Sequence, residues 1–352
     1  MLAVASRLCG LHAQVLSCAE LQVWARVDGL DRGAVQRALW QERTLVKTWA
    51  MRGTLHLLPA AELPLWHAAL STSRRYVTPE RWQKYVGITL DELDAVTVAV
   101  GEALHGRVLT REELAREIAR TGSPELGRKV AESSWGMMLK PAAFTGRLCF
   151  GPSVGARVQF TNPRSWVGMA ENGITAEEAT AEVTRRYLAS YGPATARDLS
   201  RWWNGGGVEM ARQWLGRIGS EVAEVEVEGT PAWMLTGDLK RLREVEPPRS
   251  VRLLPGFDQY VVGSSYHAEQ LMPGNFRARV FRPQGWISPV LLVDGRILGV
   301  WRHELKGSRV EIVMEPFVRV PAWVRRGAGE EAERLAVFWG GKLELGWTEP
   351  RP

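Results

Sequence analysis

The chain has 352 residues, which is too many for one ordinary domain and suits two to four domains. Its hydrophobic content of 45% is sufficient for globular cores, and no apolar run approaches the roughly 18 residues of a membrane span. The net charge of +6 favours a polyanionic partner only weakly. Three cysteines without metal-binding spacing and a start without signal-peptide features predict a reducing, cytoplasmic location.

The first notable feature is the stretch Gly10-Leu11-His12-Ala13-Gln14, which precedes a predicted helix. Ser17 and Glu20 form a capping-box pattern, so we expect the helix to start at Ser17. Residues two apart point to the same side in extended backbone but not in a helix. If His12 and Gln14 act on one atom, the backbone there should be non-helical. The alternative is that both side chains only satisfy backbone groups at a helix junction.

The capping-box pattern recurs at Thr110–Glu113 and at Thr195–Asp198. Each copy begins an amphipathic helix, which is followed by two short β-like runs around a glycine. The paired runs cover residues 45–58, 137–150 and 222–235. Helices followed by a glycine-turned hairpin are typical of the winged-helix fold, so three copies predict three tandem winged-helix units.

The pattern changes at Glu246-Pro247-Pro248, which predicts a domain boundary. Strand-like runs follow at residues 251–254, 260–262, 279–281, 290–293, 297–301 and 310–313. Asp294-Gly295 and Lys306-Gly307-Ser308 predict hairpin turns, and a helix is expected near residues 330–338. The predicted fold class is α+β. It comprises winged-helix units at residues 1–100, 101–170 and 171–246 and a C-terminal β-barrel-like domain at residues 247–352.

Two groups of cationic residues are candidates for DNA contact. Arg52 and His56 lie in the first predicted wing, although His56 between two leucines also fits an ordinary strand residue. The second group mixes cations with tyrosine and tryptophan, a combination that suits phosphate contact and base stacking. Its cations are Arg74, Arg75, Arg81 and Lys84. A solvated helix face would contain the same residue types.

Asp258 is a buriable acid within Leu254-Pro255-Gly256-Phe257-Asp258-Gln259-Tyr260. It could be catalytic, but a turn cap after Pro-Gly is the favoured interpretation. The chain has no phosphate-binding loop, dinucleotide fingerprint or HExxH motif. No histidine lies near a cysteine pair, which argues against zinc deaminase chemistry. We therefore expect neither a metal nor a cofactor.

Four stretches together resemble the AlkZ-like and YcaQ-like DNA glycosylases, a winged-helix family, and the resemblance covers nearly the whole chain. The stretches read GLHAQ at residues 10–14, WAMRGTLHL at 49–57, LLPGFDQY at 253–260 and VDGRILGVWR at 293–302. The resemblance implies three tandem winged helices followed by a C-terminal β-domain. The family's catalytic motif, Gln-apolar-Gln or Gln-apolar-Asp, maps onto His12-Ala13-Gln14. His12 and Gln14 are therefore implied to be catalytic.

His12 departs from the commonest motif, in which glutamine occupies this position. A His-apolar-Gln motif is similar to that of a subgroup associated with producers of trioxacarcin-type DNA-alkylating antibiotics. This implies a monofunctional glycosylase that removes bulky N7-alkylguanine adducts from double-stranded DNA, in self-resistance or base excision repair. We expect a monomer that does not bind membranes. The alternatives are a non-enzymatic winged-helix DNA-binding regulator, which would usually dimerise, and a protein-binding scaffold.

Overall fold

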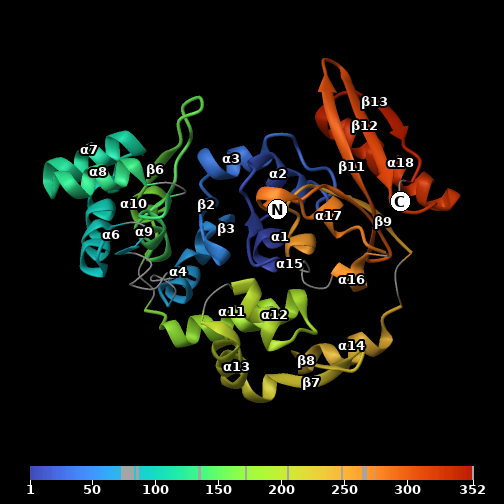
Figure 1. Cartoon of the computed structure of the whole chain (residues 1–352), viewed down its shortest axis with the longest axis horizontal. Helices are drawn as coiled ribbons and strands as arrows, with labels where there is room; N and C mark the ends of the chain where they lie inside the picture. The colour runs from blue at the N-terminus through green and yellow to red at the C-terminus, as the bar shows by residue number, and fades with distance from the viewer. Residues whose placement is uncertain are drawn as a thin grey trace. The chain divides into compact units, whose positions relative to one another are not determined.

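The computed structural model describes residues 1–72, 83–84, 87–133, 136–170, 173–203, 206–246, 249–263, 268–272 and 274–350. The chain divides into two compact units, whose helices and strands are labelled in Figure 1. Unit 1 comprises Met1, Leu11–Val35 and Lys240–Pro352, and unit 2 comprises Leu2–Gly10 and Gln36–Leu239. None of the described helices is both long and apolar enough to cross a membrane. Unit 1 thus combines the stretch that contains His12 with the C-terminal part of the chain.

Unit 1 contains a five-stranded sheet in the order β13-β12-β11-β10-β9. The strands are β9 (Val251–Leu254), β10 (Val290–Val293), β11 (Arg296–Lys306), β12 (Arg309–Pro316) and β13 (Lys342–Trp347). All neighbours are antiparallel except β12 and β13, whose parallel pairing requires the crossover helix α18 (Ala322–Trp339). Because β9 and β13 are the outer strands of an open sheet, the prediction of a barrel-like domain is wrong for the described residues.

The remaining elements of unit 1 are short. They are β1 (Leu11–His12), α2 (Leu16–Trp24), α15 (Gln259–Gly263), α16 (Ala268–Leu271), α17 (Arg277–Val280) and the 3-10 turn η7 (Pro283–Gly285). Two helices, α3 (Ala34–Trp40) and α14 (Leu239–Glu244), contain residues of both units.

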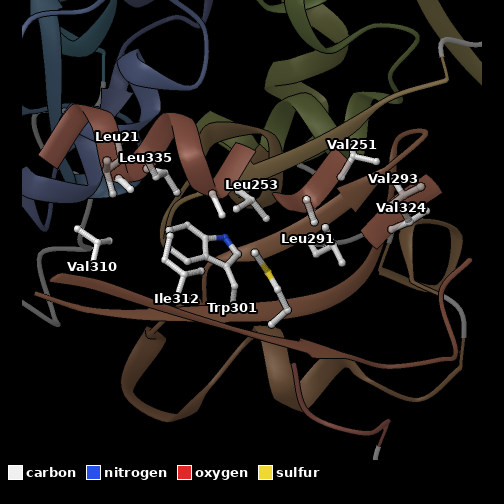
Figure 2. Packing of buried hydrophobic residues seen from close by; sticks show 14 of the residues in the cluster. Leu21, Val251, Leu253, Leu291, Val293, Trp301, Val310, Ile312, Val324 and Leu335 are labelled. Atoms are coloured by element: carbon white, nitrogen blue, oxygen red, sulfur yellow. The ribbon is translucent and has the colours of Figure 1, made fainter. Parts of the chain in front are cut away.

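One hydrophobic core joins three elements of unit 1. Helix α18 contributes one face, which repeats every three or four residues and includes Val324 and Leu335. The sheet contributes Trp301, whose indole lies in the middle of the cluster in Figure 2 and donates a 2.9 Å hydrogen bond to the Leu254 carbonyl. Helix α2 adds Leu21 and Trp24. Since each fully buried side chain of this kind contributes about 1.5–3 kcal/mol, the core fixes α2 to the C-terminal sheet.

The sequence predicted four of these strands and both hairpin turns. Asp294 and Gly295 both have positive φ angles, +49° and +78°, as the tightest two-residue turn requires. Residues 260–262 and 279–281 were expected to be strands, but they lie in or beside helices α15 and α17. Their apolar side chains enter a second core with Phe317, and a short apolar run does not distinguish a buried strand from a buried helix turn.

Unit 2 contains short strands and most of the helices. The strands are β2 (Leu45–Trp49), β3 (Leu55–Pro59), β4 (Leu109–Thr110), β5 (Cys149–Phe150), β6 (Gln159–Thr161), β7 (Val222–Val227) and β8 (Thr230–Leu235). The helices are α1 (Leu2–Arg7), α4 (Leu63–Ser71), α6 (Leu90–Leu104), α7 (Arg111–Thr121), α8 (Pro124–Glu132), α9 (Lys140–Phe144), α10 (Pro163–Val167), α11 (Ala176–Tyr191), α12 (Ala196–Trp203) and α13 (Gly207–Arg217).

Two of the three expected wing hairpins are confirmed, β2–β3 and β7–β8. The hairpin expected within residues 137–150 is wrong, because this segment contains helix α9 and its strand β5 pairs with β6 further along the chain. The number of winged-helix units and the boundaries near residues 100, 170 and 246 stay predictions.

The capping boxes show which local signals determine helix starts. Thr110–Glu113 and Thr195–Asp198 form the expected reciprocal bonds, and Thr89–Glu92 and Thr175–Glu178 form two more that were not predicted. The box expected at Ser17 is wrong. Helix α2 begins one residue earlier, at Leu16, after an N-cap residue that makes no side-chain cap.

A buried histidine in unit 2 makes stability depend on pH. His67 of α4 is packed against Gly146, where an added Cβ would come within 2.6 Å of the His67 Nδ1 atom. Neither ring nitrogen has a hydrogen-bond partner among the described residues. Burial, and secondarily the charge of Arg164, lowers the pKa of His67 to about 4.

We expect the free energy of unfolding to fall by about 3 kcal/mol as the pH drops from 6.5 to 4. In this window the unfolded chain binds a proton that folded His67 does not, at about 1.4 kcal/mol per pH unit. Urea denaturation at several pH values measures the slope, and His67→Phe should remove this part of it. His105→Gln, at an exposed histidine, is the control. The same slope in His67→Phe as in the unsubstituted protein would contradict the prediction.

Candidate functional site

His12 and Gln14 lie on non-helical backbone in unit 1. Their two-residue spacing requires such a backbone if both side chains act on one atom. His12 is in the extended strand β1, and Gln14 is in the bend that leads into α2. The two side chains differ in exposure. The His12 residue is only 5% exposed, whereas Gln14 is at the surface. The stretch therefore offers one fixed, nearly covered imidazole and one accessible amide.

Aromatic contacts fix the plane of the His12 ring. It stacks on Phe257, with ring centroids 5.2 Å apart and planes within 3° of parallel. Phe257 in turn forms a T-shaped pair with Trp286, with ring centroids 5.1 Å apart. Phe257 has a positive φ angle of +58°, which costs a non-glycine residue about 1–2 kcal/mol. The preceding Gly256 has no room for a Cβ, which would lie 2.9 Å from the Ile287 carbonyl oxygen.

Hydrogen bonds fix the backbone of His12. The fully buried Gln22 side chain donates from Nε2 to the His12 carbonyl oxygen at 2.8 Å. The Gln22 carbonyl accepts a bond from Arg26 Nη1 at 3.1 Å. Arg26 then forms a two-pronged ion pair with Asp258, with N–O distances of 2.7 and 2.8 Å. These contacts link His12 through α2 to the loop that carries Phe257.

Asp258 has two roles in this geometry. Its Oδ1 atom accepts a bond from the Tyr260 backbone N–H at 2.9 Å, so the turn-cap interpretation is confirmed. The carboxylate is also completely buried and engaged by the Arg26 guanidinium. Bidentate pairs of this kind are among the strongest hydrogen-bonded contacts in proteins. Asp258 therefore orients the loop beside His12 rather than presenting a free carboxylate.

We expect Asp258→Asn to lower the free energy of unfolding by roughly 3 kcal/mol, because it leaves the partly buried Arg26 without its counter-charge. Denaturation of the purified protein measures this loss. Asp28→Asn is the matched control, since Asp28 pairs with Arg334 at 3.3 Å on the surface and such pairs contribute at most about 1 kcal/mol. Equal losses in the two variants would show that the buried pair has no special role.

Arg52 and His56, the first expected DNA contacts, are in unit 2 and contact each other. Arg52 has a φ angle of +60°, donates to the Trp202 carbonyl at 2.8 Å and lies 3.3 Å from His56 Nε2. His56 is fully buried in β3, and its Nδ1 atom lies 3.1 Å from the Thr54 carbonyl oxygen. His56 therefore has no surface on which a phosphate could bind, and the ordinary strand interpretation describes it.

The second cationic group is only partly described. Lys84 is exposed. Arg74, Arg75 and Arg81 lie outside the described residues.

Among the residues that are described, no three histidine, cysteine, aspartate or glutamate side chains form a group that could hold a metal ion. Four residues of this site were not expected from the sequence, namely Gln22, Arg26, Phe257 and Trp286. Of these, Phe257 lies in residues 253–260, a stretch that resembles the glycosylase family and could have indicated it.

Comparisons with known proteins agree over almost the whole chain. The family model described as DNA glycosylase AlkZ-like matches residues 5–338. An interstrand DNA cross-link repair glycosylase from Streptomyces sahachiroi is 38% identical over 337 residues, which cover 95% of this chain and 89% of that protein. The solved structure of Streptomyces sahachiroi DNA glycosylase AlkZ is similar with a TM-score of 0.88 and 36% identity, covering 98% of this chain and 92% of that chain.

Proposed function

Because this chain belongs to the AlkZ-like DNA glycosylase family, we propose that it removes bulky N7-alkylguanine adducts from double-stranded DNA and leaves an abasic site. Membership confirms the resemblance seen in the sequence. It makes the chain a DNA glycosylase, a hydrolase of N-glycosyl bonds, and sets the non-enzymatic regulator aside. The observation that carries the narrower substrate proposal is the His12-Ala13-Gln14 sequence at the position of the family's catalytic motif.

The proposed chemistry suits the residue types. Alkylation at N7 makes guanine cationic and a good leaving group, so the enzyme need not protonate the base. It must instead hold a water molecule against the anomeric carbon while positive charge develops on the sugar. Gln14 can accept a hydrogen bond from this water. His12 can accept a second bond or take a proton, because a neutral imidazole has one ring nitrogen that accepts hydrogen bonds and acts as a base.

Preorganisation supports a catalytic role for His12. The ring plane is fixed by the Phe257 stack, and the backbone is fixed by the Gln22 bond. A well-oriented attack can lower the barrier by roughly 7–11 kcal/mol, provided that the catalytic groups are held in place. The exposed Gln14 amide next to a covered imidazole leaves one side of the motif accessible to water and DNA.

We expect His12→Ala and Gln14→Ala each to lower the single-turnover rate of base release about 10²- to 10⁴-fold, the range for a positioned acid–base group. DNA binding should survive, and His12→Gln should keep part of the activity because it restores the commoner motif. The assay is alkaline cleavage at abasic sites in a duplex with one N7-alkylguanine. Gln41→Ala, at an exposed glutamine, is the control. Unchanged base release by the double alanine variant would show that these residues are not catalytic.

The same assay tests the lesion preference. The relative from Streptomyces sahachiroi is named for interstrand cross-link repair. We propose that this chain instead prefers a bulky monoadduct that intercalates, since His12 replaces the usual glutamine. A duplex with a trioxacarcin-type adduct should release its base faster than one with an interstrand cross-link. The reverse order would contradict this assignment.

We propose a monofunctional reaction, without a covalent enzyme–DNA intermediate. A lyase requires an amine with a lowered pKa that can form a Schiff base. The sequence from Leu11 to Val35 contains no lysine. Burial lowers the pKa of Lys47 and of Lys140, both in unit 2, and Lys47 Nζ lies 5.4 Å from the centroid of the Phe150 ring. Borohydride should trap no adduct during turnover. Any trapped adduct would contradict the proposal, and its loss in Lys47→Met would identify Lys47 as the amine.

We expect DNA binding to fall steeply with salt and to show little sequence preference. Contacts to phosphates carry no sequence information, and each neutralised phosphate contributes about 0.9 to the slope of log affinity against log salt. Fluorescence anisotropy at several salt concentrations measures the slope. We propose that the protein binds as a monomer, so the stoichiometry should be one protein per lesion. A strong consensus from random-sequence selection would contradict this mode of binding.

A further inference from the structure

Unit 1 contains a cavity of about 550 Å³ that the catalytic proposal does not use. It lies between the segment around α17 and strands β11 and β12. Its charged and aromatic lining includes Arg279, Arg282, Arg302, Glu315, Trp286 and His303. Concave sites with a few convergent polar groups are the usual places for ligands.

Positive charge is in excess in this cavity. Three arginines face one carboxylate, that of Glu315. Glu315 is shared, 3.1 Å from Arg279 Nη2 and 3.2 Å from Arg302 Nε. Arg282 is exposed and pairs with no carboxylate in the part of the chain that the structure describes. Partial burial lowers the pKa of His303, so this ring adds no charge at pH 7. The three arginines and Glu315 therefore leave the lining with a net positive charge, which suits an anion.

The loop between α17 and β10 places a cation beside an exposed aromatic ring. The backbone N–H of Arg282 donates to the Trp286 carbonyl at 2.8 Å, so the two residues face each other across the base of the loop. Gln284 and Gly285 at its tip have φ angles of +60° and +75°, which close the turn. Trp286 is 48% exposed, unusual for a tryptophan, and presents a surface on which a base could stack.

This cavity is connected to the candidate catalytic ring. The rings of Trp286 and Phe257 meet nearly at right angles with centroids 5.1 Å apart, and Phe257 stacks on His12 with centroids 5.2 Å apart. Two such ring contacts span the length of a few nucleotides, since a DNA strand rises about 3.4 Å per nucleotide. A strand with its lesion at His12 would therefore reach the cavity with a nearby nucleotide.

We propose that this cavity is a nucleotide subsite for the substrate strand. Arg282 and Arg302 bind a phosphodiester within a few nucleotides of the lesion, and Trp286 stacks on the adjacent base. Guanidinium groups match the geometry of phosphate oxygens, and an exposed indole accepts any base. The proposal rests on the proposed function, because it places the strand relative to His12.

A methylphosphonate scan tests the subsite without turnover. Duplexes carry a tetrahydrofuran abasic analogue, and one phosphate at a time is replaced by a neutral methylphosphonate. For the unsubstituted protein we expect one or two positions near the analogue where this change weakens binding about tenfold. In the Arg282→Gln/Arg302→Gln variant the same change should have less than a twofold effect, because the cations that bind this phosphate are absent. The variant should also lower the salt slope by about 1 to 2.

Matched variants separate the subsite from general electrostatics. Arg326→Gln removes an exposed arginine of α18 in the same unit and should leave the scan unchanged. Trp286→Ala should weaken binding to the abasic duplex about tenfold, and Trp286→Phe should restore most of it. The melting temperature of each variant shows whether the loop remains folded. If Trp286→Ala unfolds, Trp286→Phe and the arginine variants alone decide.

A flat scan, or one that Arg326→Gln alters as much as the double variant, overturns the proposal. Deoxyadenosine monophosphate is the second probe. Tight binding of this nucleotide together with a flat scan would assign the cavity to a free nucleotide instead, which also overturns it. Base release is measured in the same preparations. Position-specific scan effects without base release would reject only the proposed function, and base release with a flat scan would reject only the subsite.

Discussion

The buried ion pair between Arg26 and Asp258 is the contact on which the candidate site depends, and it joins residues 232 positions apart in the sequence. An unpaired buried carboxylate is very unfavourable, so the loop around Asp258 keeps its conformation only while the guanidinium is in place. The position of Arg26 in turn follows from α2, whose Leu21 and Trp24 pack in the core with α18. The N-terminal stretch and the C-terminal sheet therefore have to form together for the His12 ring to be fixed.

Local signals in the sequence predicted local structure well. The capping boxes at Thr110 and Thr195, and the Asp294-Gly295 turn, depend on residues at most three positions apart, so they form wherever the chain permits. The box at Ser17 shows the limit. Helix α2 starts at Leu16, although Ser17 and Glu20 are present. The packing of its buried face stabilises this helix more than a capping box would, so the packing determines where it starts. The sequence did not predict the parallel strand β13. Its pairing with β12 depends on how α18 packs across the sheet between the two strands, and no local sequence signal reports this packing.

The candidate site was predictable as a set of positions but not as a set of contacts. The sequence pointed to His12, Gln14 and the cap role of Asp258 through spacing, resemblance and the Pro-Gly turn. It could not predict that Gln22 holds the His12 carbonyl or that Phe257 stacks on the ring. Both contacts depend on side-chain directions that tertiary packing determines. For the same reason His56, equally plausible from the sequence as a DNA contact or a strand residue, is enclosed in β3.

Phe257 connects the two parts of unit 1 to which we assign functions. Phe257 has a positive φ angle, and its ring makes both the parallel stack with His12 and the T-shaped contact with Trp286. A left-handed backbone is unfavourable for phenylalanine and persists only where its surroundings require it. Here the requirement comes from Gly256, which lies against the Ile287 carbonyl, and from the buried Asp258 on the other side. The catalytic proposal and the nucleotide subsite thus share one rigid support, so a strand bound in the cavity would have its position relative to His12 set by this loop.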